Sequence, residues 1–158
     1  MSEAAENLHA SVVQLGGQGV IIFGPSGSGK SALALELVRQ ASRDGIAASL
    51  VADDRVNVER RENELFASPV PSLAGLIEVR GSGIHAVPHL NETVLRLSVE
   101  LVKEQSAERL APKEKRLVAH GLALPALILP QERIDGAVRA ILSHLGLYFP
   151  LTGRKNID

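Results

Sequence analysis

The spacing of apolar residues divides the chain into short strands and two helices. Residues 95–101 alternate apolar and polar side chains, which is the clearest period-two pattern in the sequence and predicts a strand with one solvated face. Apolar residues at helical spacing predict helices over residues 31–41 and 134–145, and Gly45 and Gly146 follow their ends as stop signals.

Shorter apolar runs predict the other strands. They lie at residues 8–15, 20–23, 47–52, 56–58, 76–80, 116–119 and 126–129. The polar segments 60–64 and 103–115 predict exposed connections, and two prolines exclude a regular helix between residues 68 and 74. Strands interspersed with helices predict an α/β fold with a mixed sheet. A length of 158 residues is typical of one domain, which we assign to residues 1–158.

One glycine-rich stretch fits the phosphate-binding loop (Walker A) pattern G-x-x-x-x-G-K-[ST] at every fixed position: Gly24, Pro25, Ser26, Gly27, Ser28, Gly29, Lys30 and Ser31. It lies between a predicted strand and a predicted helix, which is the setting that the pattern requires. Glycines let successive backbone N–H groups surround phosphate oxygens, and the start of the helix adds a partial positive charge. The alternative is a glycine-rich turn without a ligand.

In such a loop, Lys30 would reach the β- and γ-phosphates of a nucleotide, and Ser31 would offer its hydroxyl to Mg²⁺. Mg²⁺ prefers oxygen ligands and often bridges to substrate phosphates. The pattern therefore predicts a site for a nucleotide and a magnesium ion.

Composition narrows the possible functions. A formal net charge of −1, three Phe, one Tyr and no Trp argue against nucleic-acid binding, which needs a basic face and usually stacking aromatic rings. The absence of cysteine excludes disulfides and thiolate chemistry. No secretory signal and no run of about 20 apolar residues is found, so we expect a cytoplasmic protein without a membrane segment.

Charged residues follow two of the predicted strands. Asp53 and Asp54 end one of them, on the side where α/β sheets bind ligands, although a solvated turn would also accommodate them. Glu78 and Arg80 lie two apart on another predicted strand and would project from one buried face. A surface ion pair is the alternative, but the neighbouring Gly81 favours a site because it permits close backbone approach.

Histidines alone give little functional information. His9 is predicted to lie in the first strand, where a histidine most often serves packing or lies on the surface. The other four show no metal-ligand spacing, and we interpret them as structural or surface residues: His85, His89, His120 and His144.

Three segments together resemble the bacterial HPr kinase/phosphorylases. They are the 24–31 stretch, Leu-Val-Ala-Asp-Asp-Arg-Val at residues 50–56, and Ile-Glu-Val-Arg-Gly-Ser-Gly-Ile at residues 77–84. The last resembles the family signature E-[IV]-R-G-x-G-[IL], which is far more specific than a phosphate loop. His9 precedes Gly24 by fifteen residues, a spacing similar to that of the active-site histidine in the family.

The resemblance spans roughly residues 9–145 and corresponds to the catalytic domain alone, as in the short forms of the family. It implies a phosphate-loop domain with a core related to phosphoenolpyruvate carboxykinase. The implied reaction is ATP-dependent phosphorylation of a serine on the phosphocarrier protein HPr. Its reversal would use inorganic phosphate and give pyrophosphate. The family is typically hexameric, so a homo-oligomer is expected.

The same resemblance implies roles for individual residues. Lys30 would hold phosphates, and Ser31 would hold magnesium together with Asp54 and Glu78. One of Asp53 and Asp54 would act as the general base and return the proton in the reverse reaction, and Asp53 is preferred. Arg80 would bind phosphates, and His9 would tune the base.

Two departures from the family pattern affect these expectations. Ser82 replaces a larger apolar residue of the signature. After Pro130, many longer members carry a loop resembling P-G-R-N, where this chain has Gln-Glu-Arg-Ile-Asp at residues 131–135. Arg133 is a candidate substitute for the missing arginine, and an exposed residue at a helix start is an equal alternative.

Two other functions fit the phosphate loop. The first is a small-molecule kinase, but no separate substrate pocket stands out in the sequence. The second is a nucleotide-binding regulatory module without catalysis, against which the four charged residues weigh, because binding alone needs fewer carboxylates: Asp53, Asp54, Glu78 and Arg80.

Overall fold

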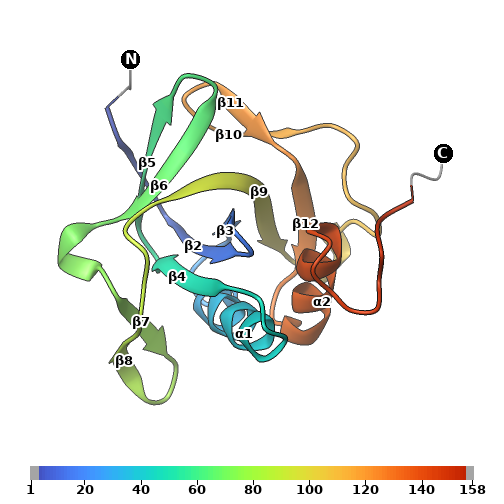
Figure 1. Ribbon diagram of the computed structural model, residues 1–158, viewed down its shortest axis with the longest axis horizontal. Helices are drawn as coiled ribbons and strands as arrows, with labels where there is room; N and C mark the ends of the chain where they lie inside the picture. The colour runs from blue at the N-terminus through green and yellow to red at the C-terminus, as the bar shows by residue number, and fades with distance from the viewer. Residues whose placement is uncertain (1–3, 156–158) are drawn as a thin grey trace.

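Figure 1 shows the computed structural model, in which residues 4–155 are described. The main sheet has eight strands in the order β1-β5-β6-β9-β3-β2-β4, with β12 paired to β9 outside this path. Their bounds are β1 (Glu6–Leu8), β2 (Ala10–Leu15), β3 (Gln18–Phe23), β4 (Ala48–Ala52), β5 (Val56–Arg61), β6 (Glu64–Pro69), β9 (Thr93–Val102) and β12 (Ala126–Pro130).

Two separate hairpins and two helices complete the fold. The hairpins are β7 (Leu76–Val79) with β8 (Gly83–Ala86), and β10 (Arg116–Ala119) with β11 (Leu122–Leu124). The helices are α1 (Lys30–Arg43) and α2 (Ile134–His144), and single 3₁₀ turns lie at η1 (Pro71–Leu73) and η2 (Glu104–Ser106). The predicted mixed α/β sheet is therefore confirmed.

Four strands of the main sheet run in the same direction. β9 pairs in parallel with β3 and with β12, and β2 lies antiparallel between β3 and β4, so that β4 also runs parallel to β3. The carboxyl ends of β3, β4, β9 and β12 therefore lie at one edge, where ligands bind in open α/β sheets. The first residues of the antiparallel β2 lie at that edge too.

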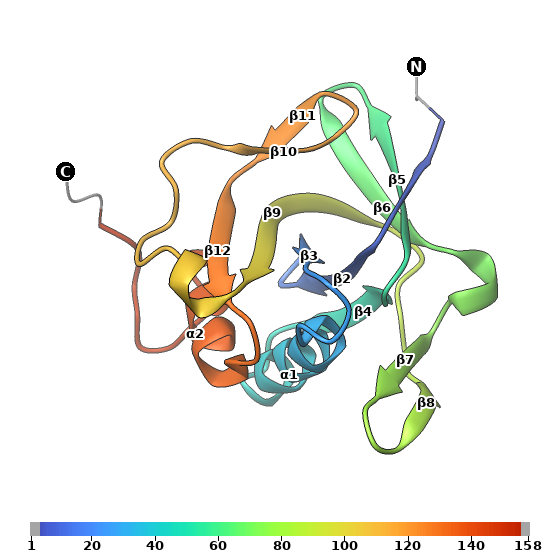
Figure 2. The same cartoon turned by 180° about the vertical axis from the view of Figure 1, so that it is seen from behind.

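The sheet separates two apolar cores. On one face α1 and α2 pack beneath the strands, and the buried stripe of α1 comprises Leu33, Ala34, Leu37 and Ala41. On the other face the strands curve around a second cluster that includes Val12, Ile21, Val56 and Leu95. Figure 2, seen from behind, shows β5, β6 and the β10–β11 hairpin on that side, away from the helices.

Several predicted boundaries need correction. His9 does not lie in a strand but at a bend between β1 and β2. The predicted 60–64 connection is only a two-residue turn, because β5 continues to Arg61 and β6 begins at Glu64. Arg61 pairs with Glu59 of its own strand and with Glu92, which precedes β9, and it lies 4.1 Å from the ring centroid of Phe66 across the hairpin in β6. Such cross-strand contacts keep a charged segment extended.

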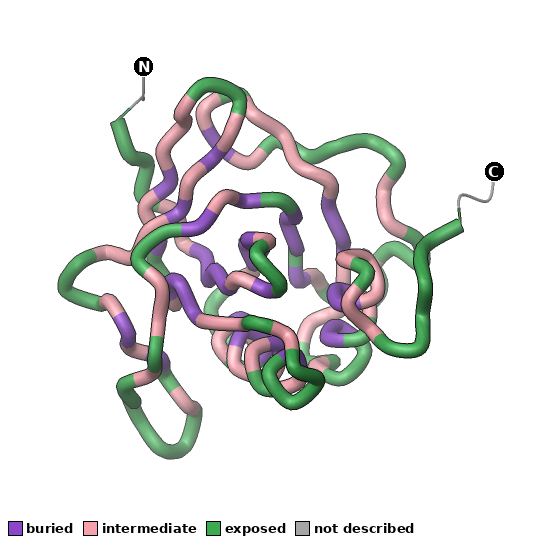
Figure 3. The backbone as a smooth tube through the Cα atoms, in the orientation of Figure 1, coloured by how far each residue is buried: buried purple, intermediate pink, exposed green. Residues whose placement is uncertain are grey.

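The apolar segment at residues 147–151, after α2, has a packed part and an exposed part. Leu147 and Tyr148 pack against the core beside the helices, whereas Phe149 and Leu151 are exposed. Figure 3 shows residues 149–155, after Tyr148, and the tip of the β7–β8 hairpin as exposed. Within residues 4–155, neither helix has the length and apolar character needed to cross a membrane.

Candidate active site

The strand register explains which residues meet at the edge of the sheet. Ala10 pairs with Phe23, so the residue before β2, His9, lies beside the start of the 24–31 loop. Val12 pairs with Ala52, so the antiparallel direction brings Ser11 beside Asp53, which follows β4. The segment that carries His9 and Ser11 and the segment that carries Asp53 are thus placed next to the glycine-rich loop, although they are far apart in the sequence.

The 24–31 loop has a tight backbone that depends on glycine. Gly27 and Gly29 have φ angles of 81° and 100°, which residues with a side chain rarely adopt. A Cβ on Gly24 would lie 2.5 Å from Ser28 Oγ and 3.1 Å from Leu101 Cβ. Ser28 Oγ is buried and has no hydrogen-bond partner among the described residues. A buried hydroxyl without a partner, beside the free N–H groups of a helix start, fits a loop that receives phosphate.

This geometry gives a prediction for Gly24→Ala. The added methyl group should displace the loop and destabilise the fold by about 1–3 kcal/mol, and it should remove most of the rise in Tm caused by Mg-ATP. Thermal unfolding with and without Mg-ATP measures both effects. Gly136→Ala is the matched control, because its Cβ would meet nothing within 4 Å in α2, and it should stabilise by about 0.5–1 kcal/mol. An unchanged response of Gly24→Ala to Mg-ATP would contradict the assignment of the loop.

Lys30 is held inside the loop. Its side chain is buried, and Nζ donates to the carbonyl oxygens of Gly24 at 2.8 Å and Pro25 at 3.2 Å. Burial lowers the pKa of Lys30 from its ordinary value, and the negative charges of Asp54 and Asp53 oppose this shift. The ammonium group therefore lies where a phosphate could replace the two carbonyl contacts.

Asp53 is surrounded by hydrogen-bond donors. Its Oδ1 accepts from Ser31 Oγ at 2.7 Å and from Ser11 Oγ at 2.9 Å, and its Oδ2 accepts from the backbone N–H of Glu78 at 3.3 Å. A carboxylate accepts and does not donate, so these three donors suit it. Asp53 is thereby fixed beside the hydroxyl of Ser31.

Asp54 points in another direction. Its backbone is left-handed, with φ of 66°, and its Oδ1 lies 2.7 Å from His9 Nε2. The Asp54 side chain is 62% exposed, whereas His9 is 36% exposed. The left-handed residue turns the chain, so that two consecutive carboxylates serve different neighbours. Asp54 is the more accessible of the two.

Glu78 and Arg80 do not share a buried strand face, contrary to the prediction. β7 ends at Val79, Arg80 belongs to the following turn, and both side chains are exposed. The hairpin has no second sheet to bury it, so its alternation does not produce an interior face. Glu78 reaches Asp53 through its main chain. Arg80 Nη2 lies 3.5 Å from the position of a Cβ on Gly27, which places the guanidinium group beside the 24–31 loop.

The segment after β12 also contacts this loop. The backbone N–H of Glu132 donates to the carbonyl of Ser28 at 3.3 Å, and Glu132 has a left-handed φ of 60°. Arg133 pairs with Glu104 of η2 at 2.6 Å, and both side chains are exposed. Residues 131–135, which differ from the family pattern, therefore contact the 24–31 loop through their backbone. Their arginine, Arg133, pairs with Glu104 instead.

Two of the remaining histidines make their contacts outside this group of residues. His120 Nε2 is 2.9 Å from the carbonyl of Val58, and His85 Nε2 is 2.7 Å from Ser82 Oγ. Within residues 4–155, no three His, Asp or Glu side chains gather as a metal site of their own. A cation here would have to share its ligands with a nucleotide and water, which is how Mg²⁺ usually binds.

Ser11 is the one residue of this group that the sequence prediction missed. It is completely buried, and it donates to Asp53 and accepts from the Asp54 N–H at 3.2 Å. The signal was present, because Ser11 is a small polar residue in an apolar strand two positions after His9.

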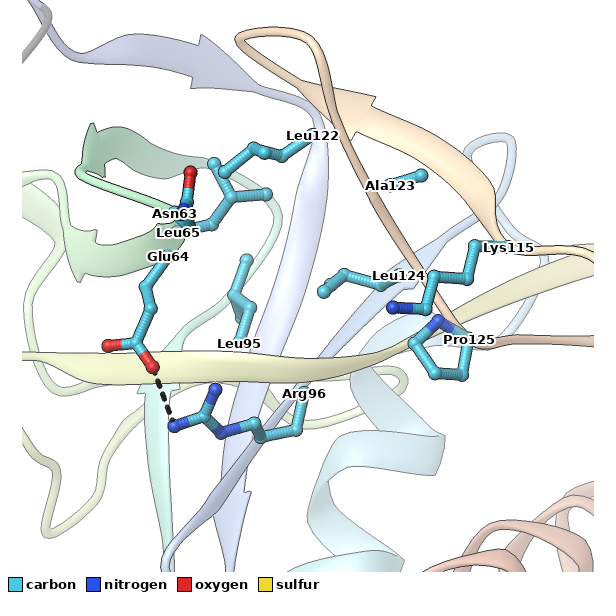
Figure 4. A pocket seen from close by; sticks show the side chains of 10 residues that line it. All are labelled: Asn63, Glu64, Leu65, Leu95, Arg96, Lys115, Leu122, Ala123, Leu124 and Pro125. Atoms are coloured by element: carbon cyan, nitrogen blue, oxygen red, sulfur yellow. Dashed lines mark ion pairs between the residues drawn. The ribbon is translucent and has the colours of Figure 1, made fainter.

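A separate pocket lies on the face of the sheet that is turned away from the helices (Figure 4). It has a volume of about 290 Å³, and its lining includes Leu65, Leu95, Leu122 and Lys115. The ion pair between Arg96 and Glu64, 3.0 Å long, lies at its border. None of the predicted site residues lines this pocket, so it is not the place where they converge.

Comparison with known proteins supports the resemblance found in the sequence. Residues 2–138 match the family model described as the HPr Serine kinase C-terminal domain. The HPr kinase/phosphorylase of Lacticaseibacillus casei is 34% identical over 142 residues, covering 82% of this chain and 43% of the relative. That of Clostridium tetani is 43% identical over 83 residues, covering 52% of this chain and 25% of the relative.

A solved structure has the same fold. The HPr(Ser) kinase/phosphatase from Coxiella burnetii superposes with a TM-score of 0.69 at 28% sequence identity, covering 86% of each chain. The chain spans less than half the length of curated relatives such as the Lacticaseibacillus casei protein.

Proposed function

Because the chain belongs to the family of HPr serine kinase C-terminal domains, we propose that it phosphorylates a serine of the phosphocarrier protein HPr with ATP. The reverse reaction would transfer the phosphoryl group from phosphoserine to inorganic phosphate and release pyrophosphate. The observation that carries the proposal is the convergence of Lys30, Ser31, Asp53, Asp54 and His9 at one edge of the sheet.

The nucleotide would bind at the 24–31 loop. Its phosphates would receive backbone N–H groups from the loop and the start of α1, together with the ammonium group of Lys30. Arg80 lies close enough to the loop to pair with the same phosphates. Mg²⁺ would neutralise charge on the phosphates. Ser31 and Asp53, whose side chains are 2.7 Å apart, would hold it, so Asp53 takes the part that the resemblance gave to Asp54.

We assign the general base to Asp54, which differs from the preference for Asp53 that the family resemblance suggested. Asp53 is occupied by three donors, whereas Asp54 is exposed to an approaching protein and is oriented by His9. A general base must come within hydrogen-bond distance of the hydroxyl proton that it removes. Glu78, whose carboxylate is exposed, would assist Asp53 and Ser31 on the cation side.

In the forward direction, Asp54 would accept the proton of the serine hydroxyl while the serine oxygen forms a bond to the γ-phosphorus. The bond between that phosphorus and the β–γ bridging oxygen breaks, and ADP leaves with the electron pair. In the reverse direction an oxygen of inorganic phosphate attacks the phosphoserine phosphorus. The bond to the serine oxygen then breaks, and Asp54 returns the proton to that oxygen, so one carboxylate can serve both directions.

The test of this function uses γ-labelled ATP, Mg²⁺ and purified HPr that carries either its acceptor serine or alanine there. We expect label on the serine form alone, and release of pyrophosphate when the labelled product is incubated with inorganic phosphate. Label on neither form would contradict the proposal. Hydrolysis or transfer to a small molecule would then indicate a metabolite kinase, and ATP binding without turnover would indicate a regulatory module.

A further inference from the structure

Ser11 is a buried polar side chain in a run of apolar neighbours. It lies in β2 with no exposed surface, between Ala10 and Val12, which are equally buried. A hydroxyl group buried in this way destabilises a fold unless it is hydrogen-bonded. The Ser11 hydroxyl should therefore have hydrogen-bond partners inside the protein.

Both hydrogen-bonding capacities of this hydroxyl are used at the candidate site. Ser11 Oγ donates to Asp53 Oδ1 at 2.9 Å and accepts from the backbone N–H of Asp54 at 3.2 Å. One side chain thus contacts the side chain of the first aspartate and the main chain of the second. The pairing of Val12 with Ala52 puts Ser11 in the position to do this.

One of these contacts orients the side chain of Asp53, and the other orients the backbone of Asp54. Asp53 is held toward Ser31 of the 24–31 loop, at 2.7 Å. Asp54 has a φ of 66°, an uncommon conformation that aspartate adopts more readily than most residues, and its carboxylate lies beside His9. The bond from the Asp54 N–H to Ser11 is one contact that holds the backbone in this conformation.

We propose that Ser11 is a positioning residue that holds Asp53 toward the phosphate loop and Asp54 toward His9. The inference rests on the proposed function, since it assigns Ser11 a part in phosphoryl transfer. Ser11 and the N–H of Glu78 hold Asp53 independently of Ser31, and a cation on the Ser31 oxygen would use a lone pair and leave the Ser31 O–H free to donate to Asp53 as well.

Three variants separate a role of the hydroxyl from a role in packing. Ser11→Ala removes the hydroxyl and leaves a small void, whereas Ser11→Cys keeps the size but is a weak donor and acceptor. Ser11→Thr keeps the hydroxyl but adds a methyl group in a fully buried position, which costs stability. Ser98→Ala is the matched control, because Ser98 is also a buried serine of the same sheet, in β9, and has no assigned role in the site.

If the hydroxyl positions the carboxylates, kcat should fall about tenfold or more in both Ser11→Ala and Ser11→Cys, with KM for HPr unchanged. Ser11→Thr should retain more activity than either, despite its lower Tm, and Ser98→Ala should match the wild type. A series that follows Tm, in which Cys is nearly as active as Ser and Thr is the worst, would overturn the proposal.

A second measurement does not depend on HPr. The Mg²⁺ concentration that gives half of the ATP-induced rise in Tm should increase several-fold in Ser11→Ala, because Asp53 loses a donor beside Ser31. An unchanged Mg²⁺ requirement would overturn the positioning of Asp53. If the wild-type protein failed to label HPr, the proposed function would fail, while this measurement would still report on Ser11.

Discussion

Replacing Lys30 with methionine is expected to lower kcat/KM for phosphoryl transfer by about 10²–10³-fold, the size of effect that follows loss of one preorganised charge contact to a transition state. Lys30 provides the buried cation of the 24–31 loop, and in the structure it binds the carbonyls of Gly24 and Pro25. Methionine fills a similar volume but cannot donate a hydrogen bond or carry the charge. The measurement is steady-state labelling of HPr at saturating Mg²⁺.

The fold itself should survive Lys30→Met. Burial already disfavours the charged form of Lys30, which is why its pKa is lowered, so an apolar replacement relieves that cost. The Tm without nucleotide should therefore stay equal or rise. Lys103→Met, which changes an exposed lysine after β9, is the control and should keep full activity. Retention of more than half of the activity in Lys30→Met would exclude Lys30 from phosphate binding.

The second large effect is expected from the two neighbouring aspartates, whose amide variants should fail for different reasons. Asp54→Asn should lower kcat by about 10²–10⁴-fold, the usual contribution of general base catalysis, with unchanged affinity for Mg-ATP. Asp53→Asn should instead raise the Mg²⁺ concentration needed for half-maximal activity. The reason is that Asp53 lies beside the Ser31 hydroxyl, whereas Asp54 lies beside His9.

Each variant is the control for the other, because the substitution is the same and the positions are adjacent. Activity and ATP-induced change in Tm are measured over a range of Mg²⁺ concentrations. If Asp53→Asn lost kcat with an unchanged Mg²⁺ requirement while Asp54→Asn changed that requirement, the roles would be reversed. Asp53 would then be the base. Full activity in both variants would contradict any catalytic role for the pair.

Parts of the fold that depend on local pattern could be predicted from the sequence. The stripe of apolar residues in 31–41 indicated α1, and the alternation of 95–101 indicated β9, since periodicity reports which side of an element is buried. α1 continues past the predicted end at Ala41 to Arg43, which the apolar pattern could not indicate because Ser42 and Arg43 are polar. β1 and β11, three residues each, were too short for such a signal.

The sequence by itself determined the family, the glycine-rich loop between a strand and a helix, and the residue types available for phosphoryl transfer, because these depend on fixed motif positions. Only the tertiary structure decided how the residues face one another. The register of β2 against β3 and β4 brings His9 and Ser11 to Asp53 and Asp54 across more than forty residues. The left-handed φ of Asp54 then turns the two carboxylates toward different neighbours. Side-chain periodicity indicates which face of a strand a residue occupies, but it identifies neither the partner residue on the next strand nor a positive φ at an aspartate.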